Sequence, residues 1–189
     1  MSGFTRQIIK ETFIRLLEEK PYSEITVKEL VEKCGINRNT FYYHFQDLPA
    51  LIEEIVRESA DSLVRKYPTL HSFLECYDAI VNYASEHRRA IMHICCSANR
   101  EMFEKHLMDT CRYFISIYAD AVFTSGDAEI DLPTKNAIID YYKCACFGFF
   151  IDCLNNDMEE DRTKTVRSLL FARRERMIEI ARMLQLSQE

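Results

Sequence analysis

The chain has 189 residues, of which only 4 are Gly and 4 are Pro, and this shortage argues against folds built from sheets and turns. With 48% hydrophobic and 29% charged residues, the chain is too apolar to be disordered. Its net charge of −6 at first sight disfavours nucleic acid as a partner, although the distribution of charge matters more than the sum.

No segment of the sequence resembles a targeting or membrane-spanning element. The longest apolar stretch, residues 144–151, is far shorter than the roughly 20 residues needed to cross a bilayer. We therefore expect a cytoplasmic protein whose eight cysteines stay reduced. No CxxC pair occurs, and His93 with Cys95 and Cys96 lacks a second ligand pair, so neither a metal site nor a cofactor is expected.

Apolar residues recur at helical spacing from end to end, which predicts an all-α protein of about nine helices. The first helix is expected over residues 5–20, with Ile9, Phe13, Leu16 and Leu17 as its apolar stripe, and Pro21 ends it. A second helix should start after Thr26, in a capping box with Glu29, and end at Gly35.

A short third helix is expected over residues 38–45, with Asn37 as its N-cap. Asp47 can cap a long fourth helix that ends near Tyr67. Further helices are expected over 73–85, opened by a capping box at Ser72 and Glu75, and over 87–97, 100–122, 134–155 and 158–186, with the clearest loop at 124–133.

The charge divides the chain into two parts. Residues 1–46 carry a net charge of +1, and the remainder carries −7. We divide the chain into a first domain over residues 1–47 and a larger helical domain over residues 48–189. We call the first part the head and the remainder the body. Because the head is slightly basic and the body acidic, the head alone could contact DNA.

Residues 26–45 form two short helices joined by a turn that contains Gly, which is the helix-turn-helix pattern. Such helix pairs also occur with a purely structural role, so the side chains must show whether this pair binds DNA. On a helical wheel Phe41 and Phe45 define the packed face, and a core helix does not explain why two tyrosines leave it. Amide, hydroxyl and imidazole groups on the outward side suit base edges and phosphates. The outward face carries Asn39, Thr40 and Tyr43, flanked by Tyr42 and His44.

The segment TVKELVEKCGINRNTFYYHFQDLPAL, residues 26–51, resembles the DNA-binding signature of TetR-family transcriptional regulators. The run from Thr40 to Phe45 is its most specific part, and the resemblance in motif covers about residues 5–55. It implies a helix-turn-helix DNA-binding domain over residues 1–47 and a helical domain for dimerisation and effector binding over residues 48–189. It also implies a homodimer that binds pseudo-palindromic duplex DNA, most often as a repressor released by a small-molecule effector. By this resemblance Thr26 and Lys28 contact the backbone or an outer base, Arg38, Asn39, Thr40 and Tyr43 enter the major groove, and Tyr42 and His44 reach phosphates.

One position departs from the family pattern. The family usually has Lys where this chain has Leu48, at the point where the fourth helix begins and approaches a phosphate. Leucine supplies no charge there, so we expect a smaller electrostatic contribution to DNA binding, and tighter binding after Leu48→Lys.

The body is expected to form the dimer, because the resemblance implies that the last two helices pair with their symmetry mates. Residues 137–139 and 144–151 are apolar on nearly every side, which is more than one core can cover. Small side chains around Gly148 would let two backbones approach closely. The expected interface comprises Cys144, Ala145, Gly148, Ile151, Leu170, Met177 and Ala181.

Regulators of this family often enclose an effector pocket in the body, and apolar side chains with polar tips are the candidates for lining it. Each candidate has an alternative interpretation as a core side chain whose polar atom is satisfied. The candidates are Tyr77, Tyr83, His93, Arg112, Tyr113, Tyr118, Tyr141 and Tyr142.

Two other classes of function remain open. A cysteine-dependent enzyme or thiol sensor would rely on His93 near Cys95 or Cys96, and no Gly-rich phosphate loop, HExxH or GxSxG motif accompanies them. We therefore expect no catalytic residues and no enzyme activity. A helical protein-interaction module would share the fold and bind no duplex.

Overall fold

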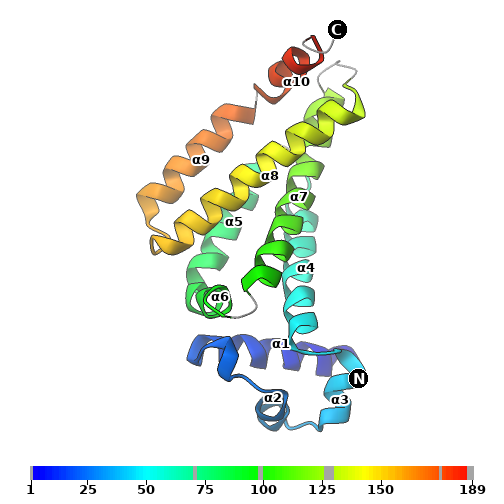
Figure 1. The fold of residues 1–189 in the computed structure, drawn as a ribbon, viewed down its shortest axis with the longest axis vertical. Coiled ribbons are helices and arrows are strands. Elements are labelled where there is room, and N and C mark those ends of the chain that lie inside the picture. Colours follow the sequence, from blue (N-terminus) through cyan, green and yellow to red (C-terminus); the bar gives the residue numbers. More distant parts are fainter. Residues whose placement is uncertain (1, 70–71, 98–99, 126–129, 175, 187–189) are drawn as a thin grey trace. The chain divides into compact units, whose positions relative to one another are not determined.

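A computed structural model describes residues 2–69, 72–97, 100–125, 130–174 and 176–186 of the chain (Figure 1). Every regular element within these residues is helical, which confirms the all-α fold class. None of the helices described is long and apolar enough to cross a membrane.

The helices lie close to the predicted ranges, except near the C-terminus. One helix was predicted over residues 158–186, and the structure has two helices there. The first of them starts only at Glu160, because Asp157 and Met158 have left-handed φ values of 56° and 54°. In chain order the elements are α1 (Ser2–Glu19), η1 (Tyr22–Glu24), α2 (Val27–Cys34), α3 (Arg38–His44), α4 (Leu48–Lys66), α5 (Phe73–Glu86), α6 (Arg88–Cys95), α7 (Arg100–Ser125), α8 (Leu132–Asn155), α9 (Glu160–Arg174) and α10 (Arg176–Leu186).

The chain divides into two compact units. Unit 1 comprises Met1–Ser59 and Glu86–His106, and unit 2 comprises Ala60–Ser85 and Leu107–Glu189. Unit 1 therefore contains the helix-turn-helix together with α6, which the sequence analysis had assigned to the body. The functional boundary after residue 47 stays a prediction.

The core of unit 1 is built on the apolar stripe predicted for α1. Ile9, Phe13 and Leu16 are fully buried, as are Leu30 of α2 and Phe41 of α3. These side chains hold three short helices together around one small core, which fixes the direction in which α3 faces away from it.

Helix α6 packs on α1 within unit 1. The Nδ1 atom of His93 lies 2.6 Å from the carbonyl oxygen of Leu17, and Nδ1 of His87 lies 3.1 Å from Oε1 of Glu18. His93 thus contributes to the support of the first helix.

Unit 2 has a separate apolar core formed by α7, α8 and α10. Two residues predicted for the dimer interface belong to it, because Met177 and Ala181 are 8% and 0% exposed in a single copy of the chain. Their own chain already covers them, so their part in a dimer interface stays a prediction that burial does not support. The core comprises Ile115, Ala119, Val122, Phe123, Ile138, Ile139, Tyr142, Met177 and Ala181.

Helices α5 and α9 are tied together by polar contacts in the same unit. The Tyr77 hydroxyl donates to the carbonyl oxygen of Thr163 at 2.9 Å, and Nε of Arg167 donates to Oδ1 of Asp78 at 2.8 Å. The start of α5 differs from the prediction, because the Ser72 hydroxyl bonds to the backbone of Thr69 in place of a capping box.

Candidate nucleic-acid interface

Helix α2 starts at the residue that the sequence predicts. The Thr26 hydroxyl accepts a hydrogen bond from the backbone N–H of Glu29 at 3.2 Å, and Thr26 itself has extended backbone angles. The carboxylate of Glu29 accepts from Nζ of Lys20 at 2.5 Å, which ties α2 to the end of α1. Thr26 therefore has its hydroxyl oxygen engaged in the helix cap, and its O–H remains the group that can face a phosphate.

The turn between α2 and α3 has the geometry that only glycine adopts without strain. Gly35 has φ of 67°, and its N–H and that of Ile36 donate to the last carbonyl groups of α2, including Ile36 to Val31 at 3.0 Å. The side chain of Asn37 then accepts from the N–H of Thr40 at 2.8 Å and starts α3. The two helices are thus fixed by local chemistry at both ends of the turn.

The two faces of α3 differ as the helical wheel predicts. Phe41 is fully buried and Phe45, just after the helix, is 4% exposed, whereas Tyr42 and Tyr43 are 55% and 78% exposed. Asn39 is exposed as well. Large aromatic side chains are uncommon on a free surface, so the outward face of α3 is suited to contact a partner.

Thr40 lies differently from its neighbours on the predicted face. It is half-buried, and its hydroxyl donates to Oδ1 of Asn37 at 3.1 Å. A hydroxyl that already donates can only accept from a base edge, so Thr40 offers less to DNA than Asn39 or Tyr43 does.

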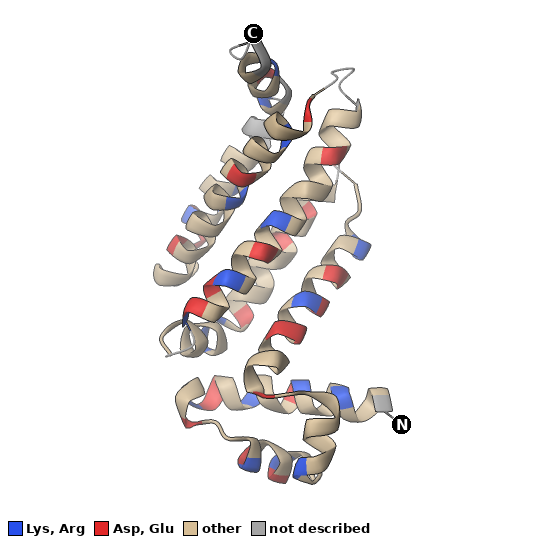
Figure 2. Cartoon of the chain, turned by 45° about the vertical axis from the view of Figure 1, so that its right-hand side comes forward, with Lys and Arg blue, Asp and Glu red and all other residues tan. Residues whose placement is uncertain are grey.

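The charged groups around α3 are few and of both signs. Helix α2 carries Lys and Glu side chains together (Figure 2), namely Lys28, Glu29, Glu32 and Lys33, whereas Arg38 is the one Lys, Arg, Asp or Glu residue of α3. Arg38 is exposed, and Lys28 is exposed at 4.0 Å from Glu32, a distance at which the pair is weak. His44 is half-buried, with its ring 5.0 Å from that of Tyr43.

The first turn of α4 explains what Leu48 does. Leu48 is 9% exposed and belongs to the core, and Oδ1 of Asp47 accepts from the N–H of Ala50 at 2.8 Å. The start of this helix thus presents the Asp47 carboxylate next to the position where the family pattern has a lysine, and that position itself holds a core leucine. Leu48→Lys therefore changes packing as well as charge, which the sequence alone does not reveal.

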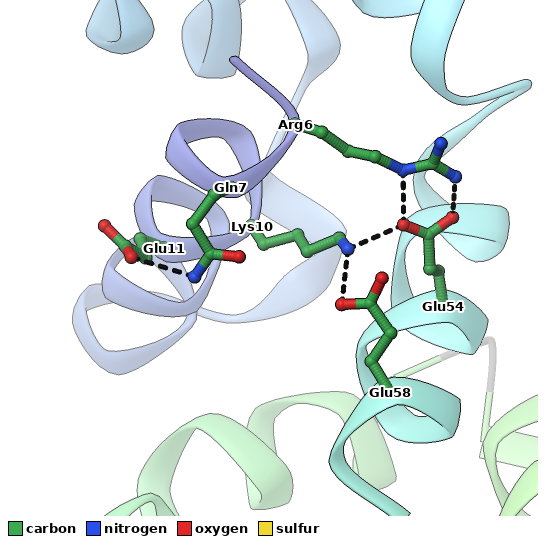
Figure 3. A network of polar contacts seen from close by, with 6 residues as sticks. All are labelled: Arg6, Gln7, Lys10, Glu11, Glu54 and Glu58. Atoms are coloured by element: carbon green, nitrogen blue, oxygen red, sulfur yellow. Dashed lines mark hydrogen bonds and ion pairs between the residues drawn. The ribbon is translucent and has the colours of Figure 1, made fainter. Parts of the chain in front are cut away.

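Sequence analysis missed a network of four charged side chains between α1 and α4 in unit 1 (Figure 3). It comprises Arg6, Lys10, Glu54 and Glu58. A signal was present, because two cations four residues apart on one helix match two carboxylates four residues apart on another. Nothing in the sequence showed that the two helices face each other there.

The residues predicted for an effector pocket do not share one environment. His93 lies in unit 1 against α1, whereas the other seven lie in unit 2. The hydroxyl of Tyr118 donates to the carbonyl oxygen of Tyr67 at 2.8 Å, and that of Tyr77 is bonded to Thr163. These two tyrosines thus fit the alternative of core aromatics with satisfied hydroxyl groups.

The remaining candidates lie near or on the surface of unit 2, apart from the buried Tyr142. Arg112 forms an ion pair with Asp140, and its Nη2 donates to Asn136 at 3.3 Å. The tyrosines Tyr83, Tyr113 and Tyr141 are exposed. Their lining of a pocket stays a prediction.

The environment of Cys95 does not favour a reactive thiol. Burial raises the pKa of Cys95 to about 11, whereas a reactive cysteine needs a lowered pKa. The adjacent Cys96 is exposed, and Nδ1 of His93 faces the Leu17 carbonyl. In the part of the chain that the structure describes, no three His, Cys, Asp or Glu residues are grouped to hold a metal ion.

One face of α8 is exposed and mostly apolar. Tyr141, Cys144, Gly148 and Phe149 are exposed, and Ala145 and Ile151 beside them are half-buried, as is Leu170 of α9. A Cβ atom built on Gly148 would lie more than 4 Å from every other part of the described structure outside its own helix backbone. The described part of the chain therefore leaves the surface around Gly148 open to a partner.

Two family models match the chain. One, described as bacterial regulatory proteins of the tetR family, matches residues 9–55, and one described as a transcriptional regulator C-terminal region matches residues 72–170. An uncharacterized HTH-type transcriptional regulator of Bacillus subtilis (strain 168), YxbF, is 29% identical over 55 residues. That match covers 29% of this chain and only 14% of YxbF.

Solved structures share the fold over nearly the whole chain. The dihydroxyacetone kinase operon activator DhaS matches with a TM-score of 0.73 and 19% identity, over 90% of this chain and 96% of DhaS. Salmonella enterica GusR matches with a TM-score of 0.62 and 16% identity, over 89% of this chain and 94% of GusR. A TetR transcriptional regulator from Rhodococcus sp. RHA1 matches with a TM-score of 0.58 and 16% identity, over 89% of this chain and 94% of that regulator's chain.

Proposed function

The chain belongs to the TetR family of DNA-binding transcriptional regulators, which are not enzymes, and we propose that its helix α3 reads an operator in the major groove. The observation that carries this proposal is the exposed face of α3. Asn39 and Tyr43 offer an amide and a phenol to base edges, while Phe41 on the opposite side is fully buried and holds the helix in place.

The side chains beside that face would position the protein on the duplex. Tyr42 and His44 lie on either side of Asn39 and Tyr43 and would donate to phosphates, and Thr26 and Lys28 at the start of α2 would do the same. Arg38 is exposed in the first turn of α3 and would reach a base edge or the backbone. Thr40, whose hydroxyl is bonded to Asn37, would serve mainly as a packing residue against the bases.

The proposed functional unit is a homodimer that binds a pseudo-palindromic site. The exposed apolar face of α8, with Cys144, Ala145, Gly148 and Ile151 and with Leu170 of α9, supports a second copy as its partner. Two copies related by a two-fold axis would present two α3 helices to successive major grooves.

The proposed regulation is repression relieved by a small molecule bound in unit 2. Its support is the family resemblance, in which a repressor released by an effector is the common arrangement. DhaS, which shares the fold, is named an activator, so the sign of regulation is itself a measured outcome. A reporter fused to the operator decides it, because a repressor lowers expression and an activator raises it.

Selection of random duplexes by the purified protein tests the proposal. The expected result is one enriched pseudo-palindromic sequence, bound with an affinity that falls as salt rises because phosphate contacts release counterions. A matched control is the Asn39→Ala, Tyr43→Ala double variant, which changes only exposed side chains, so we expect it to fold and to lose the enrichment. A wild-type protein that enriches no sequence and binds no duplex would instead support the helical interaction module.

A further inference from the structure

Four charged side chains form a compact network between α1 and α4 in unit 1 (Figure 3). Nε of Arg6 donates to Oε1 of Glu54 at 2.5 Å, and Nη2 of Arg6 pairs with Oε2 of the same carboxylate. Nζ of Lys10 lies 2.6 Å from Oε1 of Glu54 and 2.6 Å from Oε2 of Glu58. Lys10 and Glu54 are 6% and 7% exposed, so two full charges lie in the interior.

Compared with apolar side chains of the same shape, a buried network of this kind adds little net stability, because the cost of removing charges from water offsets most of their attraction. Its geometry is the more informative property. The two-point pairing of Arg6 with Glu54 fixes the plane of the guanidinium group, which a single contact to an ammonium group would not do.

The guanidinium group also touches the end of the recognition helix. The Cζ atom of Arg6 lies 5.1 Å from the centroid of the Phe45 ring, a cation–π distance. Phe45 directly follows α3, and its N–H donates to the carbonyl oxygen of Phe41 at 2.9 Å as the last bond of that helix. One planar group of α1 is thus held between a carboxylate of α4 and the C-terminal end of α3.

We propose that Glu54 is a positioning residue for DNA recognition, because it holds Arg6 over Phe45 and so fixes the angle at which α3 presents its outward face. The proposal rests on the proposed function of α3. Glu58 contacts Lys10 and not Arg6, so it stabilises the network without setting the plane of the guanidinium group.

A direct phosphate contact by Arg6 is the rival explanation for its place beside α3. The two roles predict different salt dependence. A lost phosphate contact lowers the slope of log affinity against log salt by about 0.9, whereas lost positioning leaves that slope unchanged. Arg6 has two of its donor nitrogens turned to Glu54, which favours positioning.

The test compares Glu54→Gln with Glu58→Gln, two nearly isosteric changes that remove one negative charge each from the same face of α4. Glu54→Gln should lower affinity for the selected operator about tenfold, the effect of one lost charge-assisted hydrogen bond, with affinity for random duplex and the salt slope unchanged. Glu58→Gln should leave the ratio of the two affinities at its wild-type value. Equal ratios for the two variants would overturn the proposal.

Arg6→Leu provides a second variant in case Glu54→Gln unfolds. It removes the guanidinium group and leaves Glu54 paired with Lys10, so no buried carboxylate is left alone. The expected result is again about tenfold weaker operator binding at an unchanged salt slope. A slope smaller by about one unit would identify Arg6 as a phosphate ligand and overturn the positioning role.

Hydrogen exchange of the free protein separates this inference from the proposed function. Glu54→Gln should speed exchange of the backbone amides of α3 and Phe45 more than Glu58→Gln does, whether or not the protein binds DNA. A wild-type protein that fails to select DNA would contradict the proposed reading by α3, and the exchange result would still decide the link from Glu54 to α3. Identical exchange in the two variants would overturn that link.

Discussion

Helices α3 and α8 each leave one face uncovered, and the two faces differ in chemistry. The outward face of α3 carries an amide and phenol hydroxyl groups on Asn39, Tyr42 and Tyr43, backed by a buried phenylalanine. The outward face of α8 carries Cys144, Gly148 and an exposed Phe149. The first face suits hydrogen bonding to base edges, and the second suits a close-packed apolar contact.

The difference teaches that exposure alone does not define an interface. Two aromatic side chains are exposed on each helix, Tyr42 and Tyr43 on α3 and Tyr141 and Phe149 on α8. What distinguishes the helices is the set of neighbours, which are polar and close to a capped N-terminus on α3 and small or apolar on α8. The comparison predicts that changes on α8 alter assembly, whereas changes on α3 alter DNA selection.

The largest expected effect comes from enlarging the smallest side chain on the α8 face. A Cβ atom at Gly148 has open space around it in the described structure, apart from its chain neighbours and its own helix backbone, so we expect the branched side chain of Gly148→Leu to clash mainly with a partner. We expect a shift from dimer to monomer in sedimentation at micromolar concentration. Affinity for the full operator should fall about 100-fold, because the second half-site is no longer held nearby.

Gly3→Leu is the matched control for that change. Gly3 also lies in a helix, and a Cβ atom there likewise meets nothing within 4 Å in the described structure. The Gly3→Leu control should remain a dimer, because it changes only the local properties of an open position in α1. An intact dimer of Gly148→Leu with normal operator affinity would show that the second copy binds elsewhere.

The next largest effect is on stability at acid pH and concerns the support of α3. The hydrogen bond from Arg6, with smaller contributions from Lys10, lowers the pKa of Glu54 from 4.5 to about 2. Because the folded-state pKa is the lower one, ionised Glu54 stabilises the protein above pH 4.5, and this contribution disappears as the pH falls towards 2. The contribution is about 3 kcal/mol at neutral pH, of which about 1.4 kcal/mol is lost by pH 3.5.

Urea unfolding of the wild type and of Glu54→Gln at pH 7 and pH 3.5 measures this effect. The free energies of unfolding of the two proteins should converge as the pH falls, because the variant has no carboxylate to protonate. Arg6→Leu should show the same reduced pH dependence, since it removes the main cause of the lowered pKa. Parallel curves for the wild type and Glu54→Gln would contradict the assignment.

A smaller effect separates reading from positioning on the α3 face. Asn39→Ala and Tyr43→Ala should change which operator is preferred, with about 1–3 kcal/mol at stake for each good base contact. Tyr42→Phe should weaken binding about equally on all sequences, because it removes one hydrogen bond to a phosphate. Selection of random duplexes by each variant measures this, and matching sequence preferences for all three would refute the division of the α3 face.

The sequence predicted best what depends on neighbours along the chain. Thr26, Gly35 and Asn37 set the ends of α2 and α3 through local hydrogen bonds, and Phe41 points inward because helical spacing requires it. On the predicted face Thr40 is less exposed than its neighbours, because its hydroxyl bonds to the cap residue Asn37, and the contacts of the face with DNA stay predictions.

What the sequence did not reveal depends on contacts between distant segments. The pairing of Arg6 with Glu54 joins residues 48 positions apart, and the bond from Tyr77 to Thr163 joins residues 86 positions apart. Met177 and Ala181 lie on an apolar stripe of the sequence. The stripe alone does not tell whether it is covered by the chain's own core, as in this structure, or by a partner. Periodicity gives the buried face of a helix but not the identity of what buries it.

The smallest expected effect concerns Leu48, and the chain supplies its own control. The sequence Asp-Leu-Pro opens both α4 and α8, and in both the aspartate caps the helix, with Asp131 accepting from the N–H of Thr134 at 2.7 Å. Leu48 is 9% exposed near the proposed DNA-binding face, whereas Leu132 is 66% exposed on the helix assigned to dimerisation. A lysine at either position adds the same charge.

Leu48→Lys should keep its aliphatic stem in the core and carry its ammonium group to the surface, at a cost of about 1–2 kcal/mol in the free energy of unfolding. On DNA the new cation should displace one more counterion, so that affinity for operator and for random duplex rises together and the salt slope steepens by about 0.9. Leu132→Lys should leave both the affinities and the slope at their wild-type values. An unchanged slope for Leu48→Lys would mean that the start of α4, where the Asp47 carboxylate already occupies the Ala50 N–H, does not approach a phosphate, and the α3 face would then have to be rotated away from α4 on the duplex.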